Sequence, residues 1–368
     1  MIQYLSKTIQ ESLIYKKYVI DNNLQYFKPN SSKIEKTFAD EIYSSLNRES
    51  KYINPKFFYD RKGSNLFEQI CWLPEYYPTL TEIKILKNLK SDLSKYLTDS
   101  FRLVELGSGS SVKTRLILDI FAENQNEIEY FPIDISEILT ESSELLQRDY
   151  PDLHITGVID TYEGGLEFIE KYDDKKNLII FLGSSFGNFT PNEGKDFLRK
   201  INSIMKSEDL FLIGLDLVKN KKILEDAYDD SQGITAKFNL NVLSRINDEL
   251  DADFILNNFD HVAKYNERDQ RVEMYLKSLV NQSVIISKAN LSLKLKKDEL
   301  IHTEHSHKYT IPQIKELMDK TGFEIKKYWL DTNKHYALIL ASKKQFYGFS
   351  THRKPENNHL SSSLKKFL

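Results

Sequence analysis

Cysteine and long apolar runs are nearly absent from this chain of 368 residues. Its single cysteine, Cys71, excludes an internal disulfide framework and is typical of a reducing compartment. We expect Cys71, which stands in an apolar run, to be a buried small side chain and not a nucleophile. No run approaches the roughly 18 apolar residues of a membrane-spanning helix, and the first residues lack the apolar core of a signal peptide. We therefore expect a cytoplasmic protein.

A strong charge of either sign is missing as well. The chain has 51 Lys and Arg against 54 Asp and Glu, a formal net charge of −3. Without a basic excess, neither nucleic acid nor an anionic membrane surface is expected as a partner. The composition, 40% hydrophobic and 29% charged, indicates a globular protein long enough for one large or two ordinary domains. We expect a monomer that acts on a small molecule.

A short apolar strand followed by a glycine turn is the most informative feature present. Residues 104–111 read Val-Glu-Leu-Gly-Ser-Gly-Ser-Ser, with Gly107 and Gly109 in the turn. In a parallel α/β sheet such a turn brings the backbone close to a nucleoside-containing ligand. The third glycine of a dinucleotide fingerprint is missing, and the Glu-x-Gly-x-Gly form resembles enzymes that use S-adenosylmethionine. The alternative interpretation is a simple strand-to-helix turn.

The next predicted strand ends in an acidic residue. Asp134 lies about 25 residues after the glycines, where a carboxylate that binds the ribose hydroxyls is expected. Asp134 and Ser136 also precede a helical run over 137–148, so the alternative role of either residue is a helix cap.

Strands and helices alternate through the middle of the chain. Near-continuous apolar runs favour strands that are covered on both faces, as in a parallel sheet. Thr190, followed by Pro and then Glu193, predicts a helix start with a capping box. The predicted parallel strands are 102–106, 130–134, 154–158, 178–182 and 210–215.

The pattern changes after Asp216 and later returns. A helix near 219–228 precedes alternating runs at 272–277, 291–295 and 301–309, which indicate antiparallel strands. A helix over 311–321 and strands over 323–330 and 335–342 follow. We therefore predict an α/β fold, a doubly wound, Rossmann-like sheet of seven strands with an inserted α+β domain. The first 50 residues are expected to be mostly helical and to pack on the second domain.

Five further motifs point to one family. They are Phe-Phe-Tyr-Asp at 57–60, Gly-Ser-Asn-Leu-Phe at 63–67, Leu-Pro-Glu-Tyr-Tyr-Pro-Thr at 73–79, Phe-Leu-Gly-Ser-Ser-Phe-Gly-Asn at 181–188 and Thr-Glu-His-Ser at 303–306. In this order they closely resemble the histidine Nα-methyltransferases of the ergothioneine pathway. The resemblance runs from about Asn54 to Ser342 and includes the segments 227–230, 238–239, 261–264 and 273–274.

The resemblance implies a class I methyltransferase fold with these parts. Residues 1–80 form a helical segment that carries substrate-site motifs, 81–216 the adenosylmethionine-binding core, 217–310 the inserted substrate domain, 311–344 the return to the core sheet and 345–368 a polar, mobile tail. It also implies the activity: S-adenosylmethionine as cofactor and three methylations of the α-amino group of free L-histidine, giving hercynine.

Site residues follow from the same resemblance. The cofactor would contact Gly107, Gly109, Lys113, Asp134, Asp160, Thr161 and Gly183. The family tends to have Gly-Asp-Phe where this chain has Ile-Asp-Thr at 159–161, so an aromatic contact to the adenine is missing while the acid remains. The expected catalytic residues are Asn188, which would hold the α-amino group, and Tyr59.

The amino acid would be surrounded by hydroxyl and carboxylate groups. The carboxylate would be held by Tyr76 and Tyr228, and the imidazole by Tyr59, Glu304 and Ser306, with Met274 against the ring. A carboxylate and a hydroxyl at strand positions 304 and 306 share one face and can meet both ring nitrogens. Tyrosine hydroxyls would hold a carboxylate without a fixed positive charge that repels the sulfonium.

Each of these residues also has an ordinary interpretation, such as tyrosine packing, a turn asparagine or a solvated strand glutamate. The ligand-type residues at 302–307 suggest a metal site, but a regular strand would direct His302 and Glu304 one way and His305 and His307 the other. We expect no metal. Two other functions stay open: methylation of another amino acid, such as tyrosine, tryptophan or a prenylated tryptophan, and a non-catalytic adenosylmethionine-binding protein.

Overall fold

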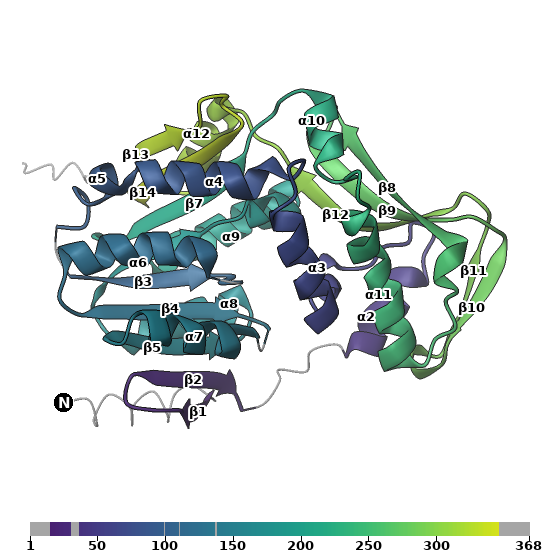
Figure 1. Ribbon diagram of the computed structural model, residues 1–368, viewed down its shortest axis with the longest axis horizontal. Coiled ribbons are helices and arrows are strands. Elements are labelled where there is room, and N and C mark those ends of the chain that lie inside the picture. The colour runs from purple at the N-terminus through teal and green to yellow at the C-terminus, as the bar shows by residue number, and fades with distance from the viewer. Residues whose placement is uncertain (1–14, 31–36, 99, 110, 137, 346–368) are drawn as a thin grey trace, which may run out of the picture.

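The computed structural model describes residues 15–30, 37–98, 100–109, 111–136 and 138–345. It has two lobes, a large sheet with helices on both faces and a smaller lobe of antiparallel strands and helices (Figure 1). Residues 346–368 of the expected tail and the first 14 residues lie outside the described residues.

The five predicted parallel strands are confirmed. They are β3 (Phe101–Leu106), β4 (Ile128–Asp134), β5 (Leu153–Ile159), β6 (Lys176–Phe181) and β7 (Leu210–Asp216). Their order in the sheet is β5-β4-β3-β6-β7, so the direction of winding reverses beside β3. The last two predicted strands, β14 (Tyr336–Lys343) and β13 (Phe323–Leu330), complete the far side of the sheet. The structure shows that β14 is antiparallel to β7 and that β13 is antiparallel to β14. A reversal of this kind leaves a crevice at the carboxyl ends of the central strands.

The opposite edge carries a hairpin that the sequence interpretation missed. Strands β1 (Tyr15–Val19) and β2 (Leu24–Pro29) pair with each other, and β2 runs parallel to β5. The sheet therefore has nine strands, and the expectation that the first 50 residues are mostly helical and pack on the second domain is wrong for this stretch. Of its described residues, only α2 (Phe38–Leu46) is helical and joins the core of the smaller lobe.

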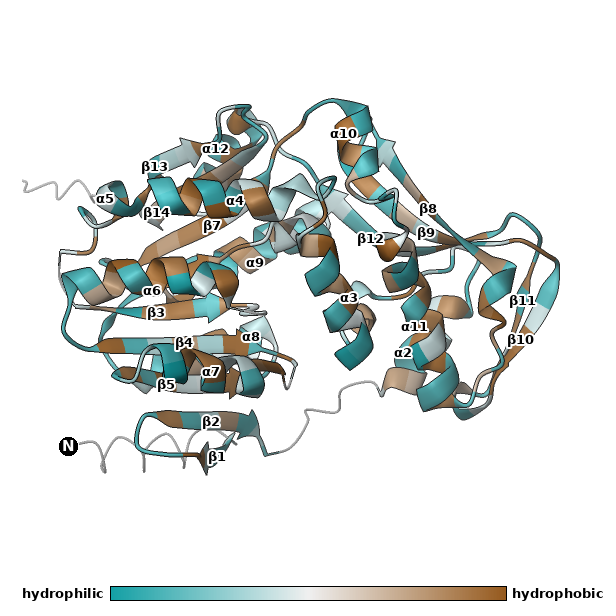
Figure 2. Cartoon of the chain, in the orientation of Figure 1, coloured by the Kyte–Doolittle hydropathy of each residue, from teal (hydrophilic) through white to brown (hydrophobic). Residues whose placement is uncertain are grey.

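Helices cover both faces of the sheet because the strands are apolar on both sides (Figure 2). One face packs against α4 (Tyr77–Asn88), α5 (Lys90–Leu93), α6 (Val112–Asn124) and α7 (Ile138–Asp149). The other packs against α8 (Tyr162–Tyr172), α9 (Pro191–Ile204) and α12 (Ile311–Lys320). The predicted capping box of Thr190 and Glu193 begins α9.

The smaller lobe is built mainly from the chain between β7 and α12. It contains a three-stranded antiparallel sheet, β12-β9-β8 (Leu300–His307, Arg271–Ser278 and Phe259–Asn266), and the pair β10 (Gln282–Ile286) and β11 (Leu291–Leu295). Helices α10 (Lys221–Asp226) and α11 (Ile234–Leu250), with α2 and α3 (Arg61–Cys71) from the N-terminal part, complete its core. Within the described part of the chain, no helix has the length and apolar character to span a membrane.

Candidate active site

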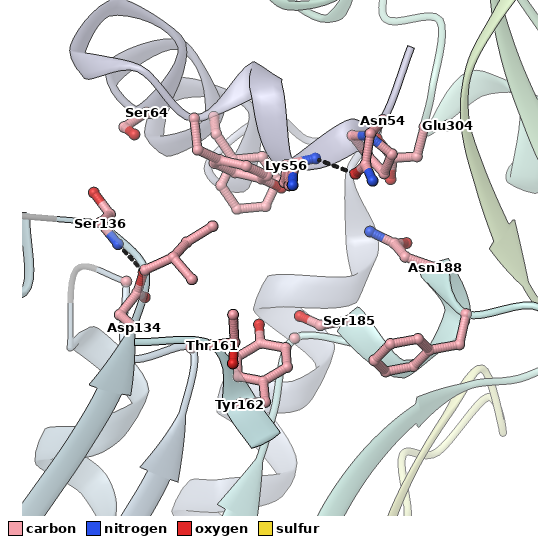
Figure 3. Close-up of a pocket in the computed structure, with 18 of the residues that line it drawn as sticks. Asn54, Lys56, Ser64, Asp134, Ser136, Thr161, Tyr162, Ser185, Asn188 and Glu304 are labelled. Atoms are coloured by element: carbon pink, nitrogen blue, oxygen red, sulfur yellow. Dashed lines mark hydrogen bonds between the residues drawn. The ribbon is translucent and has the colours of Figure 1, made fainter. Parts of the chain in front are cut away.

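A cleft of about 2490 Å³ lies between the two lobes. Its walls come from the carboxyl ends of β3, β4 and β6, from α3, and from β9 and β12 of the smaller lobe. In Figure 3, Asp134, Thr161 and Tyr162 lie on one side of the cavity, and Asn188 and Glu304 on the other. Of the predicted site residues, the cleft is lined by Tyr59, Tyr76, Gly107, Gly109, Lys113, Asp134, Thr161, Gly183, Asn188 and Glu304.

The glycine turn after β3 leaves the backbone open to the cleft. Gly107 and Gly109 have φ values of +72° and +49°, which favour glycine. A Cβ at Gly107 would lie 3.0 Å from the hydroxyl of Tyr162, whereas one at Gly109 would meet nothing within 4 Å. The Oγ atom of Ser111 is buried without a hydrogen-bond partner in the structure. Open backbone and an unpaired hydroxyl fit a polar ligand such as the nucleoside end of S-adenosylmethionine.

Asp134 ends β4 beside this turn. Its Oδ1 accepts a hydrogen bond from the backbone N–H of Ser136 at 2.9 Å, and burial raises its pKa. The helix-cap role belongs to Ser136, whose Oγ accepts from the N–H of Ile138 at 3.2 Å. The carboxylate of Asp134 therefore lines the cleft without capping α7, which fits the predicted ribose contact.

Of the two residues expected beside the adenine, Asp160 and Thr161, only Thr161 lines the cleft. Thr161 lines the cleft and caps α8. Asp160 is not among the lining residues: its Oδ2 accepts a hydrogen bond from the hydroxyl of Tyr15, and its Oδ1 accepts from the N–H of Thr161. The hairpin strand β1 thus supplies a partner to the acid that was expected beside the adenine. Tyr162, which sequence reasoning did not select, lines this end instead.

Lys113 and Gly183 are joined through a buried glutamate. The Nζ of Lys113 lies 2.6 Å from an oxygen of Glu82, a side chain with no exposed surface. The same carboxylate accepts hydrogen bonds from the N–H of Gly183 and the hydroxyl of Tyr336. Lys113 therefore compensates a buried charge beneath the loop after β6, in addition to lining the cleft.

Asn188 and Glu304 lie together where the two lobes touch. Asn188 ends the 3-10 turn η2 (Ser185–Asn188), and Figure 3 shows its side chain on the same side of the cavity as the carboxylate of Glu304 on β12. Gly187 permits the approach of η2 to β12, since a Cβ there would lie 2.9 Å from the carbonyl oxygen of His307 and 3.0 Å from Ser306 Oγ. Burial raises the pKa of Glu304 to about 7, while Lys308 and Asn188 oppose the shift.

A β-bulge decides which way the side chains of β12 point. Its register against β9 shifts between His302 and Glu304, so the expected shared orientation of these two residues is wrong. The rings of His302 and His305 stack at 5.7 Å, and those of His305 and His307 lie 5.1 Å apart. The three histidines therefore lie close together. Among the described residues, no group of three or more His, Cys, Asp or Glu side chains is placed to hold a metal ion.

A cluster of aromatic rings lies at the cleft, and three of them, Tyr59, Phe67 and Tyr76, line it. Tyr76 lies 6.0 Å from Tyr228 and 6.3 Å from Phe67, and Tyr59 lies 5.6 Å from Phe67, as ring-centroid distances. Burial raises the pKa of the three tyrosines, so their hydroxyls stay protonated near neutral pH. Cys71, expected to be buried, is half-buried and lines the cleft near them.

Tyr228, Met274 and Ser306 do not line the cleft directly and are 7%, 2% and 2% exposed. Met274 pairs with Glu304 across the two strands. The carbonyl oxygen of Tyr228 accepts from His261 Nε2 at 2.8 Å, and His261 Nδ1 accepts from Asn239 at 2.8 Å. Three of the family-like segments, 227–230, 238–239 and 261–264, thus converge to hold Tyr228 in place.

The raised pKa of Glu304 predicts a pH-dependent change in stability. Between the ordinary pKa of 4.5 and the raised pKa of about 7, only the folded state retains the proton on Glu304. The free energy of unfolding therefore falls as the pH rises through this range. Glu304→Gln should therefore raise the melting temperature of the ligand-free protein by about 2 °C or more at pH 8 and leave it unchanged at pH 4. Thermal unfolding at both pH values measures this difference.

The matched control is Glu267→Gln, which changes an exposed glutamate at the turn after β8. Equal melting temperatures for wild type and Glu304→Gln at pH 8 would show that Glu304 is not desolvated.

Comparison with known proteins finds methyltransferases that act on histidine or on related amino acids. A family model described as histidine-specific methyltransferase, SAM-dependent, matches residues 38–343. The histidine N-alpha-methyltransferase of Mycobacterium tuberculosis is 37% identical over 82% of this chain and 94% of its own length. That of Mycolicibacterium smegmatis is 36% identical over 82% and 93%. An L-tryptophan methyltransferase of Psilocybe serbica is 29% identical over 79% and 88%.

Proposed function

Because the chain belongs to the histidine-specific, S-adenosylmethionine-dependent methyltransferase family, we propose that it methylates the α-amino group of L-histidine three times to give hercynine, a precursor of ergothioneine. The observation that carries this proposal is the placement of Asn188 and Glu304 together in the cleft, across the cavity from Asp134 (Figure 3). One side chain can face the amine while the other faces the imidazole.

The cofactor end would be held by Gly107, Gly109, Asp134 and Thr161, which line one side of the cleft. When bound there, S-adenosylmethionine supplies a methyl group on a positively charged sulfur. The task of the chain is to hold the amine nitrogen in line with that group at roughly 3 Å. Asn188, at the end of the η2 turn, would orient the amine.

The amino acid's other groups would fix its orientation. The hydroxyls of Tyr76 and Tyr228 would donate to the α-carboxylate. Glu304 would accept the N–H of the imidazole, and Ser306 would donate to the other ring nitrogen. A neutral imidazole has one N–H and one nitrogen with a lone pair, which matches this pair of side chains. An indole has no such acceptor nitrogen and would leave the Ser306 hydroxyl unpaired, which favours histidine over tryptophan.

The amine must be neutral before each attack. A site that buries the amine disfavours its protonated form and so promotes loss of the proton. The aromatic rings of Tyr59 and Tyr76, which line the cleft, would reduce access of water to the bound amine. Positioning and desolvation are therefore the contributions that we assign to these residues.

Purified protein incubated with L-histidine and excess S-adenosylmethionine should yield mono-, di- and trimethylhistidine in sequence. The product masses, followed over time by mass spectrometry, measure this directly. Accumulation of monomethylhistidine alone would contradict the trimethylation, and the absence of any methylated histidine would overturn the proposed function.

A further inference from the structure

Lys308, just beyond β12, is a buried cation that contacts two predicted substrate residues. Its side chain has no exposed surface. The Nζ atom donates to Asp216 Oδ2 at 2.8 Å, to the hydroxyl of Tyr228 at 3.0 Å and to Ser306 Oγ at 2.8 Å. A lysine ammonium has three hydrogens and no acceptor, so all of its donors are used.

Asp216 is the carboxylate partner of Lys308 and of a second lysine. Asp216 also pairs with Lys219 at 2.5 Å and accepts a hydrogen bond from the hydroxyl of Tyr77 at 2.7 Å. Two lysines thus share one carboxylate. The two lysines hold the pKa of Asp216 below its usual range, and Asp216 raises the pKa of Lys308. Lys308 is therefore charged.

This charge corrects the expectation of a substrate pocket without a fixed cation. The ammonium of Lys308 contacts the hydroxyls of Tyr228 and Ser306. One of these hydroxyl groups would therefore stand between the ammonium and the bound amino acid. Because the ammonium cannot accept, the oxygens of Tyr228 and Ser306 must accept from it. Their own hydrogens are then available for a different partner.

We infer that Lys308 is a positioning residue that fixes Tyr228 and Ser306 as hydrogen-bond donors toward the amino-acid substrate. The inference rests on the proposed function. The α-carboxylate and the lone-pair nitrogen of the imidazole are both acceptors, so they match donors oriented in this way.

The test compares Lys308→Met with Lys219→Met. Each variant removes one lysine from Asp216 and leaves the carboxylate with the other, so neither strands a buried charge. Only Lys308 contacts Tyr228 and Ser306. Lys308→Met should weaken histidine binding by at least about 10-fold, measured by calorimetry in the presence of adenosylhomocysteine, while the affinity for adenosylhomocysteine stays unchanged. Lys219→Met should bind histidine like wild type.

A double-mutant cycle shows whether Lys308 acts through the two hydroxyls. In a Tyr228→Phe, Ser306→Ala background, Lys308→Met should cause almost no further loss of histidine affinity. An equal loss in both backgrounds, or an equal loss for the Lys219 variant, would overturn the inference. Should Lys308→Met not fold, Lys308→Gln replaces it in the same cycle, because its amide retains a donor; its histidine affinity should lie closer to that of wild type.

The outcomes separate this inference from the proposed function. If wild type binds and methylates histidine but the lysine variants behave alike, only the role of Lys308 is wrong. If wild type does not methylate histidine, the proposed function itself is wrong.

Discussion

Glu304→Ala should lower kcat/KM for L-histidine by at least about 10²-fold. The carboxylate is desolvated and lies near Asn188 in the cleft, so removing it takes away both the acceptor for the imidazole N–H and a polar neighbour of the amine-orienting residue. Sites that recognise a substrate through such a bond discriminate by up to about 10⁴. Initial rates with histidine at saturating S-adenosylmethionine measure the loss.

Two further variants define what Glu304 recognises. Glu304→Gln keeps an oxygen acceptor without the charge and should lose less than the alanine variant. Combining Glu304→Ala with Met274→Val, which shortens the side chain paired with position 304 across the strands, should improve turnover of tryptophan relative to histidine. Unchanged histidine turnover by Glu304→Ala would show that this residue does not contact the substrate.

Asn188→Ala should lower kcat for histidine by about 10² or more. The amide would orient the reacting nitrogen, and misplacing reacting groups by about an ångström costs a factor of that size. The affinity for adenosylhomocysteine should stay within about twofold of wild type, because Asn188 lies across the cavity from Asp134 and Thr161 (Figure 3). Single-turnover rates and cofactor titrations measure the two quantities separately.

Asn192→Ala is the matched control, since Asn192 is an exposed asparagine in the first turn of α9, shortly after Asn188. It should behave like wild type. A loss of cofactor affinity as large as the loss of rate in Asn188→Ala would assign Asn188 to the cofactor side of the cleft or to folding.

The sequence was sufficient for the parts of the fold that are set locally. Strands β3 to β7 are short apolar runs bounded by turns, and Thr190 and Glu193 form a capping box within four residues. Such features depend on neighbours in the chain. The hairpin β1 and β2 was missed because its place is set by pairing with β5, more than a hundred residues away. The alternating pattern of the hairpin is short, and nothing in it identifies β5 as the partner strand.

The same distinction holds in the site. Motif positions such as Asn188 and Glu304 were predictable from their resemblance to a family. The bulge in β12 was not, because a single shift of register reverses the facing of His302 relative to Glu304 and follows from pairing with β9. Lys308 was missed because its significance depends on Asp216 and Tyr228, which the fold brings to it from β7 and the turn after α10. The one indication of its role in the sequence was its position two residues after Ser306.

Competition among amino acids tests substrate recognition most directly. Wild-type protein is incubated with equal concentrations of L-histidine, L-tryptophan and L-tyrosine and a limiting amount of S-adenosylmethionine, and NMR locates each methyl group in the products. Recognition through Glu304 and Ser306, with the amine held by Asn188, predicts that nearly all methyl groups appear on the α-nitrogen of histidine. Methyl groups mainly on tryptophan or tyrosine, or on the imidazole ring, would contradict it.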